Sequence, residues 1–257
     1  MGAGDLASSF REWPSTLERA AILAALLPYQ DEDTPAGKNT RVSTALVLAS
    51  ASPRRRELLA RLGAPFRVVV PGVDEGSVLW KGASEETARR LAEAKAREVA
   101  ERYPRALVVG ADTLVVDRWG VLGKPREASE ARRILRRLRG RRHRVVTAIA
   151  VVRLAPSLDM VSHVVSRVVM RPYTDAEIAA YVSSGDPLDK AGAYGVQHPV
   201  FAPAAAVEGC YCNVVGLPLL RLARALGRAG LRLLPLHRLS LPGPCARCPD
   251  RALWDEA

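Results

Sequence analysis

The sequence predicts an α/β domain in which a mixed β-sheet is flanked by helices. Apolar runs rich in β-branched residues alternate with stretches of helical periodicity over most of the chain, as is typical of α/β domains. Two of these runs, Val145–Leu154 and Met160–Met170, are separated by a short polar stretch, which predicts long antiparallel neighbours. A length of 257 residues, with 48% apolar and 25% charged residues, fits one large globular domain with appendages.

The domain begins with a buried strand, Ala45–Ala49, which runs directly into a helix start. Ser52 is a typical N-cap, Pro53 suits the first helical position, and Gly63 suits the helix end. The expected elements that follow are a strand at Phe66–Val70 and a helix that Ser84 caps and that ends near Tyr103.

The second half continues the alternation. Ala106–Asp117 is expected to form either one long bent strand or a pair of strands around Gly110. Three further helices are expected at Ala128–Leu138, Asp175–Ser183 and Leu217–Leu226.

The two ends of the chain differ from this domain in composition. Residues 1–42 predict an N-terminal extension and linker, in which Thr16–Leu27 has the pattern of a short amphipathic helix. Residues 237–257 are rich in proline and glycine between Leu241 and Pro249 and predict a poorly ordered C-terminal tail. The domain itself is therefore expected to span 43–236.

Charge and composition narrow the function classes. The net charge is +11, carried mostly by arginine, which suits polyanionic ligands and equally fits an arginine bias without functional meaning. The sequence contains no apolar run long enough to span a membrane and no signal-peptide pattern. Its four cysteines do not suggest a disulfide framework, so we expect a cytoplasmic protein.

Cysteine spacing leaves one alternative open. Cys245 and Cys248 form a Cys-x-x-Cys pair, which is typical of zinc sites. Cys210 and Cys212 precede them without the usual spacing of a second pair. Zinc binding and four separate cysteines are both compatible with the sequence.

The helix start at Ser52-Pro53 predicts a phosphate site. Free backbone N–H groups and the positive end of the helix dipole attract anions there. Helical spacing places Arg55 on the same face as the apolar residues of the helix and points Arg54 and Arg56 away from that face. A cation in the first turn is unfavourable without an anion, so we interpret Arg55 as a ligand contact rather than a side chain that extends to solvent.

Two charged residues occur where apolar residues are expected. Lys95 lies in the apolar stripe of its helix, so its amine must reach a carboxylate, a ligand anion or, with a buried stem, solvent. Asp112 lies inside a β-rich apolar run. A carboxylate buried there could orient or deprotonate a water or hold a divalent ion, whereas a turn beside Gly110 would leave it solvated.

Weaker signals come from three loops. Asp74 and Glu75 follow a strand, where carboxylates suit hard cations, although a solvated loop is more common. Lys124 lies in a rigid Gly-Lys-Pro turn that lacks the spacing of a P-loop. The loop from Asp189 to Gln197 contains glycines that allow close approach to a ligand, and the Gln197 amide could read a base edge.

Together, seven segments resemble the Maf family, the septum-formation-associated nucleoside triphosphate pyrophosphatases, over roughly Ala45–Arg228. The matching segments are Leu48 to Arg55, Val73 to Glu75, Glu93 to Ala96, Gly110 to Thr113, Gly123 to Pro125, Asp189 to Gln197 and Asn213 to Pro218. Their order makes the match specific. The resemblance implies an elongated, two-lobed single domain of the Maf/ITPase-like type, and it implies a homodimer.

The resemblance also implies roles for individual residues. Asp112 would be the proton acceptor and, with Glu75, would hold a divalent metal cation, Mg²⁺ or Mn²⁺. The residues expected to bind substrate are Ser50, Arg54, Arg55, Lys95, Thr113, Lys124, Lys190 and Gln197. Thr113, with Arg55 and Gln197, resembles the branch that hydrolyses dTTP and UTP rather than the branch that acts on 7-methyl-GTP. One departure is His198-Pro199, where family members commonly have a glycine after the glutamine.

Two other functions compete with this interpretation. The arginine-rich stretch from Arg126 to Arg144 could bind nucleic acid in a cell-division regulator, although it lacks interleaved aromatic residues and also fits a solvated basic face. A degenerate relative could bind nucleotides without hydrolysing them, but Asp112 and Lys95 are both present. We therefore expect a nucleoside triphosphate substrate, without a membrane or nucleic-acid partner.

Overall fold

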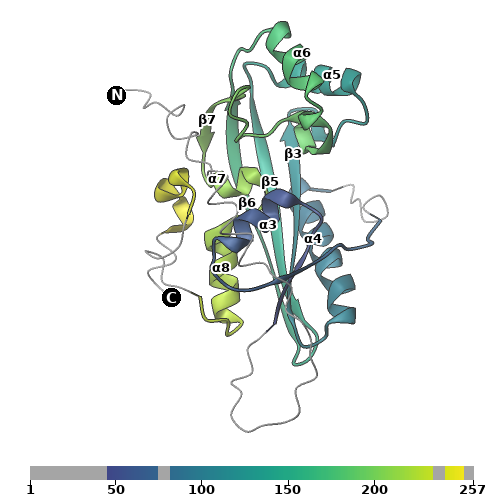
Figure 1. The fold of residues 1–257 in the computed structure, drawn as a ribbon, viewed down its shortest axis with the longest axis vertical. Coiled ribbons are helices and arrows are strands. Elements are labelled where there is room, and N and C mark those ends of the chain that lie inside the picture. The colour runs from purple at the N-terminus through teal and green to yellow at the C-terminus, as the bar shows by residue number, and fades with distance from the viewer. Residues whose placement is uncertain (1–44, 75–81, 234–240, 252–257) are drawn as a thin grey trace.

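A seven-stranded mixed sheet forms the centre of the molecule in the computed structural model, which describes residues 45–74, 82–233 and 241–251. The strand order is β2-β1-β3-β5-β6-β7, and β4 pairs separately with β3. Figure 1 shows an elongated molecule whose long axis follows β3, β5 and β6. The expected fold class, a mixed sheet flanked by helices, is confirmed.

The first strands pair in parallel. β1 (Leu46–Ala49) lies between β2 (Arg67–Val69) and β3 (Leu107–Asp117) and is parallel to both. Helix α3 (Pro53–Ala60) connects β1 to β2, with Ser52 as its N-cap. The expected strand and helix start are thus confirmed.

The remaining strands are antiparallel. β5 (Arg142–Arg153) pairs with β3 on one side and with β6 (Leu158–Met170) on the other. The pairing of β3 with β5 continues from Val108 to Val116. The segment Ala106–Asp117, for which the sequence allowed one bent strand or two strands, therefore forms one strand. The expected antiparallel neighbours are confirmed, and β7 (Ala204–Glu208) completes the far edge.

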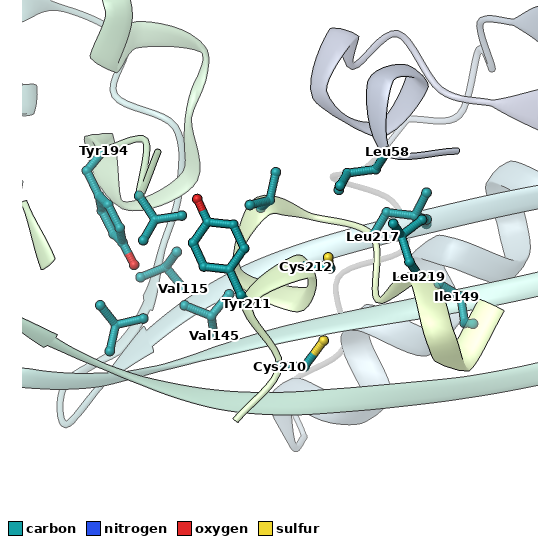
Figure 2. Packing of buried hydrophobic residues seen from close by; sticks show 14 of the residues in the cluster. Leu58, Val115, Val145, Ile149, Tyr194, Cys210, Tyr211, Cys212, Leu217 and Leu219 are labelled. Atoms are coloured by element: carbon teal, nitrogen blue, oxygen red, sulfur yellow. The ribbon is translucent and has the colours of Figure 1, made fainter. Parts of the chain in front are cut away.

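Helices cover both faces of the sheet. Helix α4 (Ser84–Arg102) packs its alanine-rich side on one face, against Val108, Val146 and Ala148. On the other face lie α3, α7 (Tyr211–Val215) and α8 (Leu219–Arg228). Figure 2 shows this second core, where Leu58 of α3 and Leu219 of α8 gather near Ile149 of β5.

The far end of the long strands carries a smaller group of helices. Helices α5 (Ala128–Leu138) and α6 (Asp175–Ser183) pack against each other there, as Figure 1 shows. Both have the bounds that the sequence predicts. No helix in the described part of the chain is long and apolar enough to cross a membrane.

Several expectations need correction. Ser84 is not an N-cap: it is the first residue of α4, Ala83 occupies the cap position, and the Ser84 hydroxyl donates to Glu85 instead. The last helix begins at Leu219 rather than Leu217, because Pro218 takes its cap position. The hairpin strand β4 (Gly120–Leu122), β7 and α7 were not predicted.

The C-terminal segment also differs from the expectation. Residues 241–251 form two short 3₁₀ turns rather than a poorly ordered tail, because Cys245 and Cys248 are buried against the core. The N-terminal extension, with its expected helix at Thr16–Leu27, lies outside the described residues. The boundaries at 42 and 236 stay predictions.

Candidate active site

One stretch of β3 has no paired strand along one of its two edges. On the same edge of β3, β1 pairs as far as Gly110 and β4 pairs from Val115 onward. The residues between these pairings, 111–114, keep their partners in β5 on the opposite edge. Side chains from this stretch can therefore reach an opening beside the end of β1, while β5 holds their backbone in place.

Asp112 and Lys95 form a buried ion pair at this opening. Lys95 Nζ donates to Asp112 Oδ1 at 2.6 Å, and each residue is only 6% exposed. The Lys95 amine thus reaches a carboxylate rather than solvent, and Asp112 lies within a strand rather than in a turn. A buried carboxylate needs a partner of this kind.

Gly110 lets α4 approach close enough for this contact. A Cβ atom at position 110 would lie 2.2 Å from the carbonyl oxygen of Ala92 and 2.9 Å from the amide nitrogen of Ala96. Only glycine fits between strand and helix at this spacing. The distance between α4 and β3, and with it the position of Lys95, therefore depends on Gly110.

Arg55 of α3 packs against the face of β3 opposite to Asp112, where it contacts Thr113. Its Nε donates to the carbonyl oxygen of Gly216 at 2.9 Å, and its Nη2 donates to Thr113 Oγ1 at 3.1 Å. Its Nη1 lies 3.5 Å from Ser50 Oγ. The expected core-facing position of Arg55 is confirmed, and these contacts fix its guanidinium beside the end of β1.

A buried asparagine that sequence reasoning did not select supports this region from α7. Asn213 Oδ1 accepts from the backbone N–H of Thr147, and its Nδ2 donates to Val145 O and to Ser166 Oγ. Thr147 Oγ1 lies 2.9 Å from Thr113 Oγ1 and so extends the network to the site. A buried amide inside the apolar run Asn213-Val214-Val215 was the sequence signal that could have identified it.

The loop after α6 is held by charge pairs. Lys190 Nζ donates to Asp186 Oδ1 at 2.8 Å and to Asp189 Oδ1 at 2.6 Å, and Arg54 Nη1 donates to Asp189 Oδ2 at 3.2 Å. Burial acts to raise the pKa of Asp189, but the Lys190 hydrogen bond and the charges of Arg54 and Lys190 outweigh it, so this pKa lies below its ordinary value. Arg54 and Lys190 are thus fixed relative to each other.

The unusual His198-Pro199 sequence forms part of a compact turn. His198 Nδ1 accepts from the backbone N–H of Phe201 at 2.9 Å, and its ring packs edge-on against Tyr181 with centroids 4.7 Å apart. The Tyr181 hydroxyl also accepts from the N–H of Gly195 at 3.0 Å. Tyr181 therefore anchors the loop that leads to Gln197.

These elements surround a cavity of about 610 Å³ beside the end of β1. Nine of the ten residues that the sequence singles out line it: Ser50, Arg54, Arg55, Lys95, Asp112, Thr113, Lys124, Lys190 and Gln197. The tenth, Glu75, lies outside the described residues. Stretches far apart in the sequence thus converge on one cavity, although their roles stay predictions.

Charge makes this cavity suited to a polyanion. The basic residues on its wall are Arg54, Arg55, Lys95, Lys124 and Lys190, and the acidic ones are Asp112 and Asp189. Both carboxylates are already paired with cations. The remaining positive charge and the nearby start of α3 favour a ligand with several negative charges.

The donor set fits a hard divalent cation held jointly with such a ligand. Within 45–74, 82–233 and 241–251, no three His, Cys, Asp or Glu side chains form a ready-made metal cage. Mg²⁺ commonly uses one or two protein carboxylates together with substrate phosphates and waters. Asp112 provides one such carboxylate on the wall of the cavity.

The basic stretch around α5 is largely neutralised. Arg136 and Arg139 both pair with Asp175, and Arg137 pairs with Asp117. Further arginines in and near this region form ion pairs with four other acidic residues, Glu85, Glu130, Glu177 and Glu208. Such pairing is typical of a solvated charged face, and the nucleic-acid interpretation loses its main support.

Comparison with known proteins agrees with this geometry. The family model described as "Maf-like protein" matches residues 45–229. A protein of Thermomicrobium roseum named dTTP/UTP pyrophosphatase is 47% identical over 204 residues, which cover 79% of this chain and 93% of the relative. Proteins of the same name from Moorella thermoacetica and Dictyoglomus thermophilum are 50% and 45% identical, over 72% and 74% of this chain and 95% and 98% of the relatives. The chain belongs to the Maf-like protein family.

Proposed function

We propose that this protein is a nucleoside triphosphate pyrophosphatase that hydrolyses dTTP and UTP to the monophosphate and pyrophosphate. The observation that carries the proposal is the buried carboxylate of Asp112, which is paired with Lys95 on the wall of a positively charged cavity. The names of the relatives give the substrates. The protein would remove dTTP and UTP, or modified pyrimidine nucleotides, from the nucleotide pool.

The triphosphate is expected to lie along the cationic wall. Arg54, Arg55 and Lys124 would pair with phosphate oxygens, while Ser50 and the start of α3 add hydrogen-bond donors. Lys190 is bound by Asp186 and Asp189, so we assign it chiefly to holding the loop that faces the substrate. Thr113 and Gln197 would contact the pyrimidine base.

Asp112 would act as the general base. Its carboxylate takes a proton from a water, whose oxygen attacks the α-phosphorus while the bond from that phosphorus to the bridging oxygen of pyrophosphate breaks. Lys95 orients the carboxylate, and the arginines offset the negative charge that develops on the phosphoryl oxygens. A Mg²⁺ or Mn²⁺ ion held by Asp112 and Glu75 would add further charge stabilisation when bound.

We also propose that the protein works as a cytoplasmic homodimer. The four cysteines are free thiols, as is typical of the cytosol. The dimer rests on family resemblance. Size-exclusion chromatography with light scattering measures it directly, and a monomer at micromolar concentration would contradict it.

The test is a panel of nucleoside triphosphates with Mg²⁺ or Mn²⁺, read by pyrophosphate release. We expect dTTP and UTP to be the best substrates. Asp112→Asn should keep the fold and nucleotide binding but lose turnover by about 10²–10⁴-fold, since it removes the base without changing size. The matched control is Asp159→Asn, which should retain full turnover, because Asp159 lies on β6 in an exposed ion pair with Arg97 of α4.

The outcomes separate the competing functions. Full turnover by Asp112→Asn would remove this residue from the chemical step. Salt-sensitive DNA binding without release of pyrophosphate from any nucleotide would favour the nucleic-acid regulator. Nucleotide binding without hydrolysis by the wild-type chain would favour the degenerate relative.

A further inference from the structure

Two threonine hydroxyls meet where β3 pairs with β5. Thr113 and Thr147 are partners in this pairing, and their Oγ1 atoms are 2.9 Å apart. The next pair on the same face of the sheet is Val115 with Val145, which Figure 2 shows beside Tyr211 of α7. Thr113 lines the cavity, whereas Thr147 is fully buried in the core. The two hydroxyls therefore connect the wall of the cavity with the core behind it.

The proton of the Thr147 hydroxyl is already committed to α7. Thr147 Oγ1 donates to the backbone carbonyl oxygen of Asn213 at 2.8 Å, and a carbonyl can only accept. A hydroxyl carries one proton, so Thr147 Oγ1 can meet Thr113 only as an acceptor. The Thr113 hydroxyl must therefore donate its own proton to Thr147.

Arg55 fixes the other side of the Thr113 hydroxyl. Arg55 Nη2 donates to Thr113 Oγ1 at 3.1 Å, and a guanidinium has only donors. Since a hydroxyl oxygen has two lone pairs, Thr113 Oγ1 keeps one of them for a ligand. Gly216 leaves room beside this oxygen, because a Cβ there would lie only 3.4 Å from it, and Gly216 also lines the cavity. Toward a ligand in the cavity, Thr113 can therefore accept a hydrogen bond but cannot donate one.

We propose that Thr147 is a positioning residue that makes Thr113 select bases with a proton on N3. This inference rests on the proposed function, in which Thr113 contacts the pyrimidine. Uracil and thymine carry a proton on N3, whereas N3 of cytosine is an acceptor, and proteins distinguish bases on this Watson–Crick edge. Thr113 would accept from the N3–H of uracil or thymine, but its lone pair would face the lone pair of cytosine N3. A hydroxyl outside the cavity would thus decide which pyrimidine is rejected.

Gln197, the other residue expected at the base, cannot impose this choice. Its side-chain amide has both a donor and an acceptor, so it can pair with either kind of base edge. Of the two residues, Thr113 alone has its hydrogen-bonding role fixed by its neighbours.

The buried side chain of Asn213 keeps this arrangement in place. Its Oδ1 accepts from the backbone N–H of Thr147 at 2.9 Å, and its Nδ2 donates to the carbonyl oxygen of Val145 at 3.0 Å. These contacts hold the Asn213 carbonyl opposite the Thr147 hydroxyl, with or without a nucleotide. In Thr147→Val, the Thr113 proton loses its acceptor and can rotate toward the cavity, where it can donate to N3 of cytosine.

The experiment compares kcat/KM for dTTP and dCTP in the full chain, read by pyrophosphate release. We expect the wild type to prefer dTTP by at least about 10²-fold, and Thr147→Val to reduce this preference by about 10-fold or more, because a mismatched acceptor pair becomes a hydrogen bond. Thr147→Ser keeps the hydroxyl and should keep the preference. The matched control is Thr87→Val, because Thr87 is a buried threonine of α4 whose hydroxyl donates to the carbonyl oxygen of Ala83. Thr87→Val should also keep the preference, since a loss of stability lowers both kcat/KM values alike.

A double-mutant cycle tests whether Thr147 acts through Thr113. Thr113→Val removes the hydroxyl that reads the base, so adding Thr147→Val to it should change the preference by less than about 2-fold. A full additional loss in the double variant would show that Thr147 acts by another route and would overturn the proposal. Thr147→Ala, which also lacks the hydroxyl, replaces Thr147→Val if the valine variant does not fold.

The outcomes separate this inference from the proposed function. If the variants without the Thr147 hydroxyl hydrolyse dTTP with an unchanged preference, the inference is overturned and the proposed function stands. Equal kcat/KM for dTTP and dCTP in the wild type would overturn it as well. If the wild type hydrolyses no nucleotide, the proposed function fails, and equilibrium binding of dTTP and dCTP makes the same comparison. A binding preference for dTTP that Thr147→Val abolishes would then support the inference, and equal binding by the wild type would overturn it.

Discussion

Gly110 is the most sensitive position for the geometry of the proposed base. In Gly110→Ala, the new Cβ would lie 2.2 Å from the Ala92 carbonyl oxygen and 2.9 Å from the Ala96 amide nitrogen. Both are backbone atoms of α4, which no side-chain rotation can move away. Ordinary contact requires about 3.5 Å, so α4 must shift by roughly 1 Å from β3.

This shift has a cost in stability and in turnover. Overpacking of a core costs about 1–3 kcal/mol, and a domain of this size loses about 2–4 °C of melting temperature per kcal/mol, which gives a decrease of about 2–12 °C. Helix α4 also carries Lys95, whose ammonium is 2.6 Å from Asp112. A displacement of about 1 Å in a catalytic group can lower turnover by about 10²-fold, and we expect that order of loss.

The assay combines thermal unfolding with pyrophosphate release from dTTP at a temperature well below both transitions. Gly227→Ala is the control, because a Cβ atom there meets nothing within 4 Å and alanine suits a helix. Equal melting temperatures and turnover in the two variants would refute the packing argument. Reduced stability with full turnover would show that the shift of α4 does not reach Lys95.

Two further predictions concern the core around the site. Burial lowers the pKa of His143 to about 4, whereas in the unfolded chain it is 6.5. The neutral imidazole therefore stabilises the fold fully above about pH 6.5, and the free energy of unfolding falls by about 3 kcal/mol as the pH is lowered to 4. Urea unfolding at several pH values should show this loss and its absence in His143→Gln, and identical pH profiles would contradict it. Asn213→Ala leaves the Thr147 N–H and Val145 carbonyl without their partner and should cost about 2–4 kcal/mol in the same assay, whereas a change below about 0.5 kcal/mol would exclude the network as a support.

Long, strongly periodic segments could be predicted from the sequence, and short ones could not. Helices α5 and α6 have the predicted bounds, because each has an apolar stripe and clear end signals. β7 is alanine-rich, and α7 has only five residues, so neither has enough periodicity to be recognised. Their places in the fold come from tertiary contacts with β6 and β5.

The same limit applies to the site. Lys95 and Asp112 were recognisable because each is a charge in an apolar pattern, but that they pair with each other could be seen only in three dimensions. The cysteines show the limit more clearly. Sequence spacing separates Cys212 from Cys245 by 33 residues, and only the packing of the C-terminal turns on α7 brings their sulfurs together.

The arrangement of strands explains why the candidate site lies where it does. A fully paired β3 would have a strand beside residues 111–114, and neither Asp112 nor Thr113 could border an opening. Because β1 stops at Ala49 and β4 begins its pairing only at Val115, the edge is open for four residues. Alternation along the strand then sends Asp112 toward Lys95 on one face and Thr113 toward Arg55 on the other. The proposed base and Thr113, which holds the guanidinium that would bind phosphate, are thus adjacent in sequence, and β5 fixes the backbone of both before any substrate arrives.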